Sequence, residues 1–458
     1  MQTVHRQNVL DRRRFLIGTG MAGAAGASAA LLPSHSAHAK AGPGFPTDLV
    51  AAGKVDWRAV RRQFLLPADM VYLNSGSEGS MPGFVQAGLN RYSAQWAANP
   101  SYSFFDDPVL GEDQTVNRAA LARFTGTAAE NICITNNTTM GLAMVVNGLD
   151  FKRGDQILTT NQEHYSLLSP LNVLTQRFGV EVVQVPIPTP PPSPEAIVAA
   201  FENAISTNPK VRGLFFSHVT WTTGLRLPVA ELCALARRQG AVTLVDGAQS
   251  MGVVDLDFNQ LGCDFYACPG HKWLNGPPGT GILYIRDAAR NPFNLWPTIS
   301  EESLEPQNPI STQLQVRGCN NTPSYAAMVM AMEFEAAIGK RAIEQRLVEL
   351  SAAVKLNVVS RWGTGALFTP SDPRMSSGIT AFVPSTDPNK RHDQNFINTV
   401  VTALQKQFGI WGRSTLFVNS ADPSGQTNYA IRISTNIFND ERQIVRLFDA
   451  LSQITKES

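Results

Sequence analysis

The chain has 458 residues, of which 43% are hydrophobic and 16% are charged. This length exceeds one domain of typical size and predicts two, and the composition excludes a disordered or collagen-like chain. Lysine and arginine number 38 against 37 aspartate and glutamate, so the net charge of +1 provides no basic surface for nucleic acid and no acidic tail. The function must therefore be sought in local chemistry.

Five cysteines are spread from Cys133 to Cys319 without a C-x-x-C pair. Their odd number and irregular spacing describe neither a disulfide framework nor a zinc site. Buried free thiols are the expectation, and the sequence predicts no metal centre.

Residues 1–39 have the pattern of a twin-arginine signal peptide. Adjacent arginines in Asp11-Arg12-Arg13-Arg14 precede a glycine-diluted apolar stretch, which ends in Ala37-His38-Ala39, an A-x-A cleavage pattern. The alternatives are a permanent anchor, for which the stretch is short, and a disordered basic N-terminus. We expect export to the periplasm by the twin-arginine machinery, a mature chain beginning near Lys40, and no stable membrane span in later residues.

Short apolar, β-branched runs alternate with helical stretches from about residue 131 to 285, which predicts an α/β fold with a parallel sheet covered by helices. One of the helices begins at Pro228 and is closed by Gly240. Beyond Gly318, a long helix over about 324–358 and a final helix over about 440–453 indicate a second, smaller α+β domain. The strand candidates are 132–135, 156–159, 181–185, 213–217, 242–245 and 281–285.

Polar residues follow these strand candidates, where ligands bind in an open α/β sheet. Thr138 and Thr139 begin an apolar helix and could hold a phosphate or simply cap the helix. His164 is more typical of a structural residue when taken alone. Asp246 ends an apolar run, so its carboxylate needs a partner, which a helix cap or ion pair could also provide. Lys272 lies among apolar and glycine residues, where lysine is seldom buried without a reason.

Together these groups match the demands of pyridoxal phosphate (PLP): a bound phosphate, a stacked aromatic ring, a partner for the ring nitrogen and an amine for the aldehyde. The chain resembles the class V aminotransferase superfamily of fold-type I PLP enzymes, which includes cysteine desulfurases and isopenicillin N epimerase. The likeness runs from Tyr72-Leu73-Asn74-Ser75-Gly76-Ser77 to Ile431-Arg432-Ile433-Ser434. Its most specific parts are Asp246-Gly247-Ala248-Gln249 and Gly270-His271-Lys272-Trp273-Leu274.

The resemblance implies a homodimer. Each chain would have an N-terminal segment (40–75), a large PLP-binding domain (76–317) with a mostly parallel seven-stranded sheet between helices, and a small C-terminal α+β domain (318–458). For the cofactor ring, the resemblance implies that Lys272 bonds the aldehyde, Asp246 pairs with the pyridine nitrogen, His164 stacks on the ring and Gln249 binds the phenolic oxygen. The cofactor phosphate would be held by Thr138, Thr139, His271 and Thr280. The resemblance also implies that Arg432 binds the substrate α-carboxylate and that Asn74 contacts the substrate. The neighbouring subunit could provide Thr280.

The sequence departs from the family pattern in three ways. Pro269 replaces a serine or threonine that cysteine desulfurases carry before the lysine, which puts one phosphate contact in doubt. Cys319 stands where relatives often have threonine, and a small buried thiol is the expectation there. No cysteine follows Cys319, so the persulfide-carrying cysteine of a desulfurase is missing and desulfurisation is excluded.

These features predict an exported aminotransferase-like enzyme that binds an amino acid, or a group derived from one, as an external aldimine. Epimerisation or carbon–sulfur lysis on the same scaffold, and a cofactor-free binding protein, are the alternatives. Export together with this fold resembles the periplasmic enzymes that finish peptide siderophores of the pyoverdine type, which suggests a role in siderophore maturation.

Overall fold

A computed structural model describes residues 46, 48–51, 53–422 and 424–455. The predicted twin-arginine signal peptide at 1–39 lies outside these residues. In the part of the chain that the structure describes, no helix combines the length and the apolar character that crossing a bilayer requires.

A seven-stranded sheet forms the large α/β layer, and this fold class is confirmed. The strands run in the order β4-β10-β9-β8-β7-β5-β6, and only β10 is antiparallel to its neighbours β9 and β4. All the strand candidates are present, and β9 is an additional strand that precedes the Lys272 loop. The bounds are β4 (Ile132–Thr135), β5 (Gln156–Thr160), β6 (Glu181–Val185), β7 (Val211–Ser217), β8 (Val242–Asp246), β9 (Phe265–Pro269) and β10 (Gly281–Ile285).

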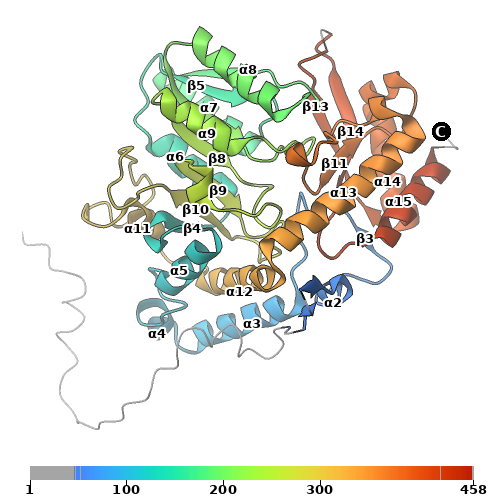
Figure 1. The fold of residues 1–458 in the computed structure, drawn as a ribbon. Coiled ribbons are helices and arrows are strands. Elements are labelled where there is room, and N and C mark those ends of the chain that lie inside the picture. The colour runs from blue at the N-terminus through green and yellow to red at the C-terminus, as the bar shows by residue number, and fades with distance from the viewer. Residues whose placement is uncertain (1–45, 47, 52, 423, 456–458) are drawn as a thin grey trace, which may run out of the picture. The chain divides into compact units, whose positions relative to one another are not determined.

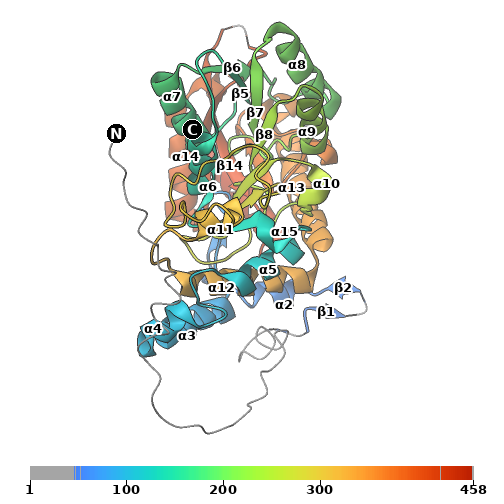
Figure 2. The same ribbon diagram turned by 90° about the vertical axis from the view of Figure 1, so that its left-hand side faces the viewer.

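Helices cover both faces of this sheet (Figure 2). Apolar residues of α6 (Thr138–Gly148) and α7 (Tyr165–Phe178) form a core with one face, and those of α8 (Pro194–Thr207) and α9 (Val229–Arg238) belong to the core on the other. Because both faces are buried, the central strands are continuous apolar runs, as in other parallel sheets. The polar groups that could bind a ligand at this sheet are therefore expected at the strand ends.

A second, smaller sheet lies in the C-terminal part of the chain (Figure 1). Its order is β11-β14-β13, all antiparallel, with β11 at Ile379–Phe382, β13 at Arg413–Val418 and β14 at Thr427–Ser434. Its core includes apolar residues of α13 (Lys340–Trp362), α14 (Gln394–Phe408) and α15 (Glu441–Ile454). The N-terminal segment packs with this C-terminal part of the chain, because β3 (Val71–Tyr72) pairs in parallel with β12 (Ile410–Trp411).

The prediction of one long helix over 324–358 was wrong. Gly339, with a φ of +101°, separates α12 (Thr322–Ile338) from α13, and an L-residue rarely adopts such a backbone conformation. Apolar residues of α12 belong to the core of the large sheet, together with residues of α3 (Gly83–Ala98) and α5 (Thr115–Phe124). The domain limits at 75/76 and 317/318 stay predictions.

The expectation of buried free thiols is confirmed for Cys133, Cys233, Cys263 and Cys268. It was wrong for Cys319, whose side chain is exposed.

The remaining elements are short. They are β1 (Val50–Ala51), β2 (Lys54–Val55), α2 (Trp57–Arg61), α4 (Pro100–Phe105), α10 (Phe258–Leu261), α11 (Ile310–Gln315) and 3-10 turns at Ala129–Asn131, Thr364–Ala366, Pro373–Met375 and Pro388–His392.

Candidate active site

Unpartnered donors gather at the start of α6, next to the loop that carries Lys272. The Oγ1 atom of Thr138, at the first turn of α6, and the Nδ1 atom of His271 are buried and have no hydrogen-bond partner among the described residues. Buried polar atoms are normally paired, so both atoms are suited to donate to or accept from a bound ligand. Free backbone N–H groups at a helix N-terminus favour an anion. Thr139 is exposed and donates to Ser166 Oγ (3.0 Å).

His164 is held as a neutral ring at the start of α7. Its Nδ1 atom accepts a hydrogen bond from the backbone N–H of Ser166 (3.1 Å), which leaves the ring proton on Nε2. Burial and then the nearby charge of Lys272 lower the pKa of His164 to about 4. Trp221 packs edge-on against the ring, with centroids 5.2 Å apart. His164 therefore presents a flat, uncharged surface at neutral pH.

Asp246 ends β8 with its carboxylate buried. One of its oxygens accepts from the backbone N–H of Ala248 (2.8 Å), and burial raises the pKa of the carboxyl group. A cationic ring N–H would stabilise the ionised form in this position. Gln249 is fixed in orientation, because its Nε2 donates to Gly76 O and its Oε1 accepts from the indole N–H of Trp273, both at 2.8 Å.

Lys272 lies on the loop between β9 and β10. Burial is the main cause that lowers the pKa of its amine to about 8, and the carboxylate of Asp246 acts in the opposite direction. The backbone of Gly79 packs directly on this loop: its N–H donates to His271 O (2.8 Å), and an added Cβ would lie 1.8 Å from Lys272 O. Thr280 is buried nearby and donates to Pro277 O (2.6 Å), and its predicted phosphate role stays a prediction.

Arg432 comes from β14 of the small sheet. It is 1% exposed, and burial lowers the pKa of its guanidinium to about 9. Its Nη1 atom donates to Trp221 O (2.8 Å) and Nη2 donates to Ser77 Oγ (2.8 Å), with Asn74 Oδ1 at 3.5 Å. The structure thus brings Asn74 and Arg432 together. The Nε atom is buried without a partner within the described part of the chain.

Four residues at or beside the site were missed as candidates. Glu163 is buried beneath the site, and its carboxylate accepts from Thr160 Oγ1 (2.6 Å) and Ser217 Oγ (2.5 Å). Its position directly before His164 was a usable signal. Arg432 donates to Ser77 Oγ and Trp221 O, and Arg413 also donates to Ser77 Oγ. These three residues could be found only from the strand pairing and loop contacts of the folded chain.

The side chains present fit PLP. Thr138, His271 and the first turn of α6 match its phosphate, and the buried carboxylate of Asp246 matches its ring N–H. The flat face of His164 matches the ring, and the amine of Lys272 matches the aldehyde. The unpartnered buried atoms support this fit independently of any sequence likeness. The residue roles themselves stay predictions.

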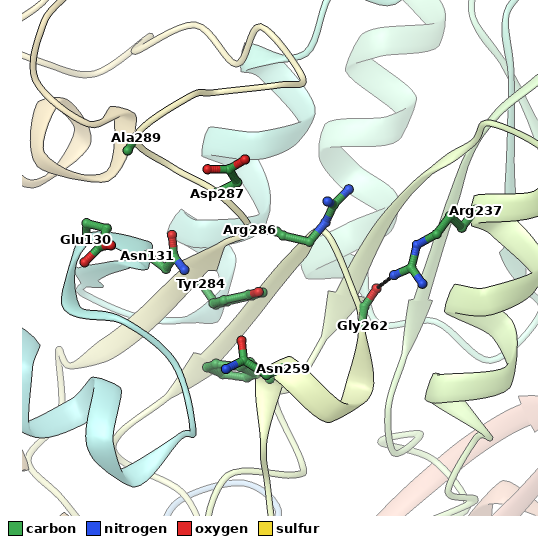
Figure 3. A pocket seen from close by; sticks show the side chains of 10 residues that line it. Glu130, Asn131, Arg237, Asn259, Gly262, Tyr284, Arg286, Asp287 and Ala289 are labelled. Atoms are coloured by element: carbon green, nitrogen blue, oxygen red, sulfur yellow. Dashed lines mark hydrogen bonds between the residues drawn. The ribbon is translucent and has the colours of Figure 1, made fainter.

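A surface pocket of about 310 Å³ lies at the opposite end of these strands (Figure 3). Arg286, directly after β10, and Tyr284 line it, together with Arg237, which donates to Gly262 O (2.7 Å). The active-site end of β10 is Gly281, which pairs with Pro269 just before the Lys272 loop. This pocket is therefore not part of the candidate active site.

The sheet order and this arrangement of lysine, aspartate and anion-binding groups define a fold-type I enzyme. The chain belongs to the aminotransferase class-V family, whose model matches residues 71–447. It is 31% identical to isopenicillin N epimerase of Streptomyces clavuligerus and 32% identical to that of Amycolatopsis lactamdurans. These matches cover 88% and 87% of this chain and 99% of each relative.

A solved structure of the cystine C–S lyase C-DES is also similar. In it, a variant of C-DES carries glycine covalently linked to its PLP cofactor. The TM-score is 0.72 at 28% identity, and the match covers 86% of this chain and 98% of that chain. The predicted family and fold are confirmed.

Proposed function

We propose that this class V enzyme, with PLP as its cofactor, is an aminotransferase that acts on an amino acid or an amino-acid-derived group. PLP supplies an aldehyde that bonds amines and a protonated ring that takes up electrons when a bond to the α-carbon breaks. The protein binds and orients the cofactor and the substrate, and its side chains hold or move protons. The unpartnered donors at Thr138 and His271, together with the family membership, support the cofactor assignment.

Asp246 holds the proton on the ring nitrogen through its ionised carboxylate, which stabilises developing charge by a preorganised partner. Lys272 moves a proton at the α-carbon. With a pKa of about 8, roughly a tenth of this amine is neutral at pH 7, and a neutral amine can act as a base. Arg432 binds the substrate carboxylate, a task suited to a guanidinium group.

The buried amine of Lys272, with a pKa of about 8, can exchange protons with a substrate near neutral pH, and this observation carries the choice of reaction. His164, with a pKa of about 4, is a poor base under these conditions. Glu163 has a pKa of about 7, but Thr160 and Ser217 hydrogen-bond both of its oxygens. A transamination needs only one such group, because the same amine can take the proton from the α-carbon and return it elsewhere.

Epimerisation is the second candidate, and the two epimerase relatives with 31% and 32% identity favour it. Incubation of the PLP-loaded enzyme with single amino acids in D2O separates the reactions. A keto acid supports transamination, an inverted amino acid with deuterium at the α-carbon supports epimerisation, and pyruvate with a released thiol supports carbon–sulfur lysis. The Lys272→Ala variant is the control, and activity in this variant would refute the role of Lys272.

A cofactor-free binding protein with a retained fold is the alternative from another class. Purified protein of this kind would be colourless after incubation with PLP and removal of the unbound PLP. The proposal instead requires a protein-bound absorption band near the short-wavelength end of the visible range. Borohydride should remove this band, and peptide mapping should then find the reduced cofactor attached to Lys272.

We further propose export to the periplasm and a role in maturation of a pyoverdine-type siderophore. The paired arginines of residues 12–13 and the A-x-A pattern at 37–39 support export, and the compartment together with the fold supports the siderophore role. Fractionation should find the protein in the periplasm and an Arg12→Lys/Arg13→Lys double variant in the cytoplasm. An unchanged siderophore profile in a deletion strain would refute the maturation role.

A homodimer is proposed from the family likeness alone. Sedimentation of the purified chain should give about twice its mass of 49.7 kDa. A monomeric active enzyme would show that Thr280 serves only its own chain.

A further inference from the structure

Arg413 and Arg432 lie directly opposite each other in the antiparallel pair β13–β14. Residues that are directly opposite in such a pair project from the same face of the sheet, with Cβ atoms about 4.5–5.5 Å apart. Arg432 faces the candidate active site, so Arg413 faces it too. The charge of Arg413 is among the causes that lower the pKa of Lys272 and of His164, which agrees with this orientation.

Two like charges in this position are unfavourable unless an anion compensates them. Arg413 Nη1 and Arg432 Nη2 both donate to the hydroxyl oxygen of Ser77, at 3.2 and 2.8 Å. Among the described ion pairs, none includes either arginine. The buried Nε of Arg432 also lacks a partner in the described chain. Within the described residues, no ion pair therefore compensates the charges of Arg413 and Arg432.

The two arginines differ in depth. Arg432 is 1% exposed and donates to Trp221 O and Ser77 Oγ, whereas Arg413 is exposed. An anion on Arg432 would therefore lie deep, near Lys272, and an anion on Arg413 would lie further out. A single carboxylate on Arg432 would leave the outer charge uncompensated.

We propose that the substrate is an amino acid with a second anionic group at the end of its side chain, with its α-carboxylate on Arg432 and its side-chain anion on Arg413. This inference rests on the proposed function and specifies its substrate class. Guanidinium groups bind carboxylates and related oxyanions through paired N–H donors. Ser77 Oγ accepts a hydrogen bond from each guanidinium group and so links the two side chains.

The test is a spectral titration of the PLP-loaded enzyme, in which binding of an amino acid shifts the cofactor absorption band. Glutamate and aspartate are compared with glutamine and asparagine, which have the same shape without the second charge. Cysteic acid tests a sulfonate in the same position. Wild-type enzyme should bind at least one acidic amino acid about tenfold or more tightly than its amide, a difference typical of one charge-assisted contact.

Arg413→Gln should bring the affinities for the acid and its amide close to each other, and Arg413→Lys should retain part of the preference for the acid. Arg442→Gln, at an exposed position on α15, is the matched control and should behave as wild type. An equal loss for the acid and the amide in Arg413→Gln, or a wild-type enzyme without preference for the acid, would overturn the inference. If the wild-type protein forms no cofactor band at all, the proposed function fails instead.

Discussion

Glu163 and Ser217 join two neighbouring strand ends beneath the site: the Ser217 hydroxyl donates to Glu163 Oε2 at 2.5 Å, and the Ser217 N–H donates to Oε1 at 3.2 Å. Ser217 is in turn the register partner of Asp246. Burial nevertheless raises the pKa of Glu163 to about 7, because desolvation outweighs these hydrogen bonds. A carboxyl group in this environment is easier to bury protonated than ionised.

The Glu163→Gln variant should be more stable than wild type at alkaline pH. The raised pKa means that the folded chain holds this proton up to about pH 7, whereas the unfolded chain releases it near pH 4. Folding free energy is therefore lost as the pH rises between these values, by about 3–4 kcal/mol in total. Thermal unfolding at pH 5 and pH 8 measures this loss.

Glutamine mimics the protonated acid, so the melting temperatures of the Glu163→Gln variant and wild type should be close at pH 5. At pH 8 the variant should melt several degrees higher. Glu349→Gln, at an exposed position on α13, is the control. Equal melting temperatures of the Glu163→Gln variant and wild type at pH 8 would contradict the raised pKa.

Attachment of PLP to the apo protein should speed up with pH and level off above about pH 8. Only the neutral amine of Lys272 can attack the aldehyde, and its pKa is about 8, so the rate should rise about tenfold per pH unit below that value. Stopped-flow absorbance measures this rate. A profile that still rises steeply above pH 9 would show an ordinary, solvated lysine, and Lys272→Ala should form no band.

Asp246→Asn should bind PLP and lose most of its turnover. The amide keeps the size of the side chain but cannot compensate the positive charge of the ring nitrogen, so kcat should fall by about 100-fold or more. Steady-state kinetics measures kcat, and the absorption band measures retained cofactor. An unchanged kcat would refute the assigned role, and Glu202→Gln on the surface of α8 is the control.

Gly79→Ala should weaken cofactor binding without touching a reacting group. The new methyl carbon would lie 1.8 Å from the carbonyl oxygen of Lys272, so either this loop or the Gly79 segment must shift. Overpacking of this kind costs about 1–3 kcal/mol. Gly365→Ala is the control, because the nearest atom to its added carbon is 3.9 Å away. Equal PLP affinity and melting temperature in both variants would contradict the close packing.

The sequence revealed the groups that follow directly after a strand or helix signal. Asp246 was found because a carboxylate ends an apolar run, and Lys272 because it stands between glycines and apolar residues. Arg413 could not be found in this way, since its role depends on the β13–β14 register, which links it to Arg432 only in the folded sheet. The break at Gly339 was missed because apolar residues continue with helical spacing on both sides of it.

The pairing of β3 with β12 joins Val71 to Ile410, positions at almost opposite ends of the polypeptide. Arg432 lies still later, on a strand whose last residue, Ser434, bridges to Asn74. A ribosome must therefore release nearly the entire chain before the part of the candidate active site that contains Arg432 can form. Contacts of such long sequence separation form slowly, so a truncated or still nascent chain would have the residues for the cofactor but could not bind and orient its substrate.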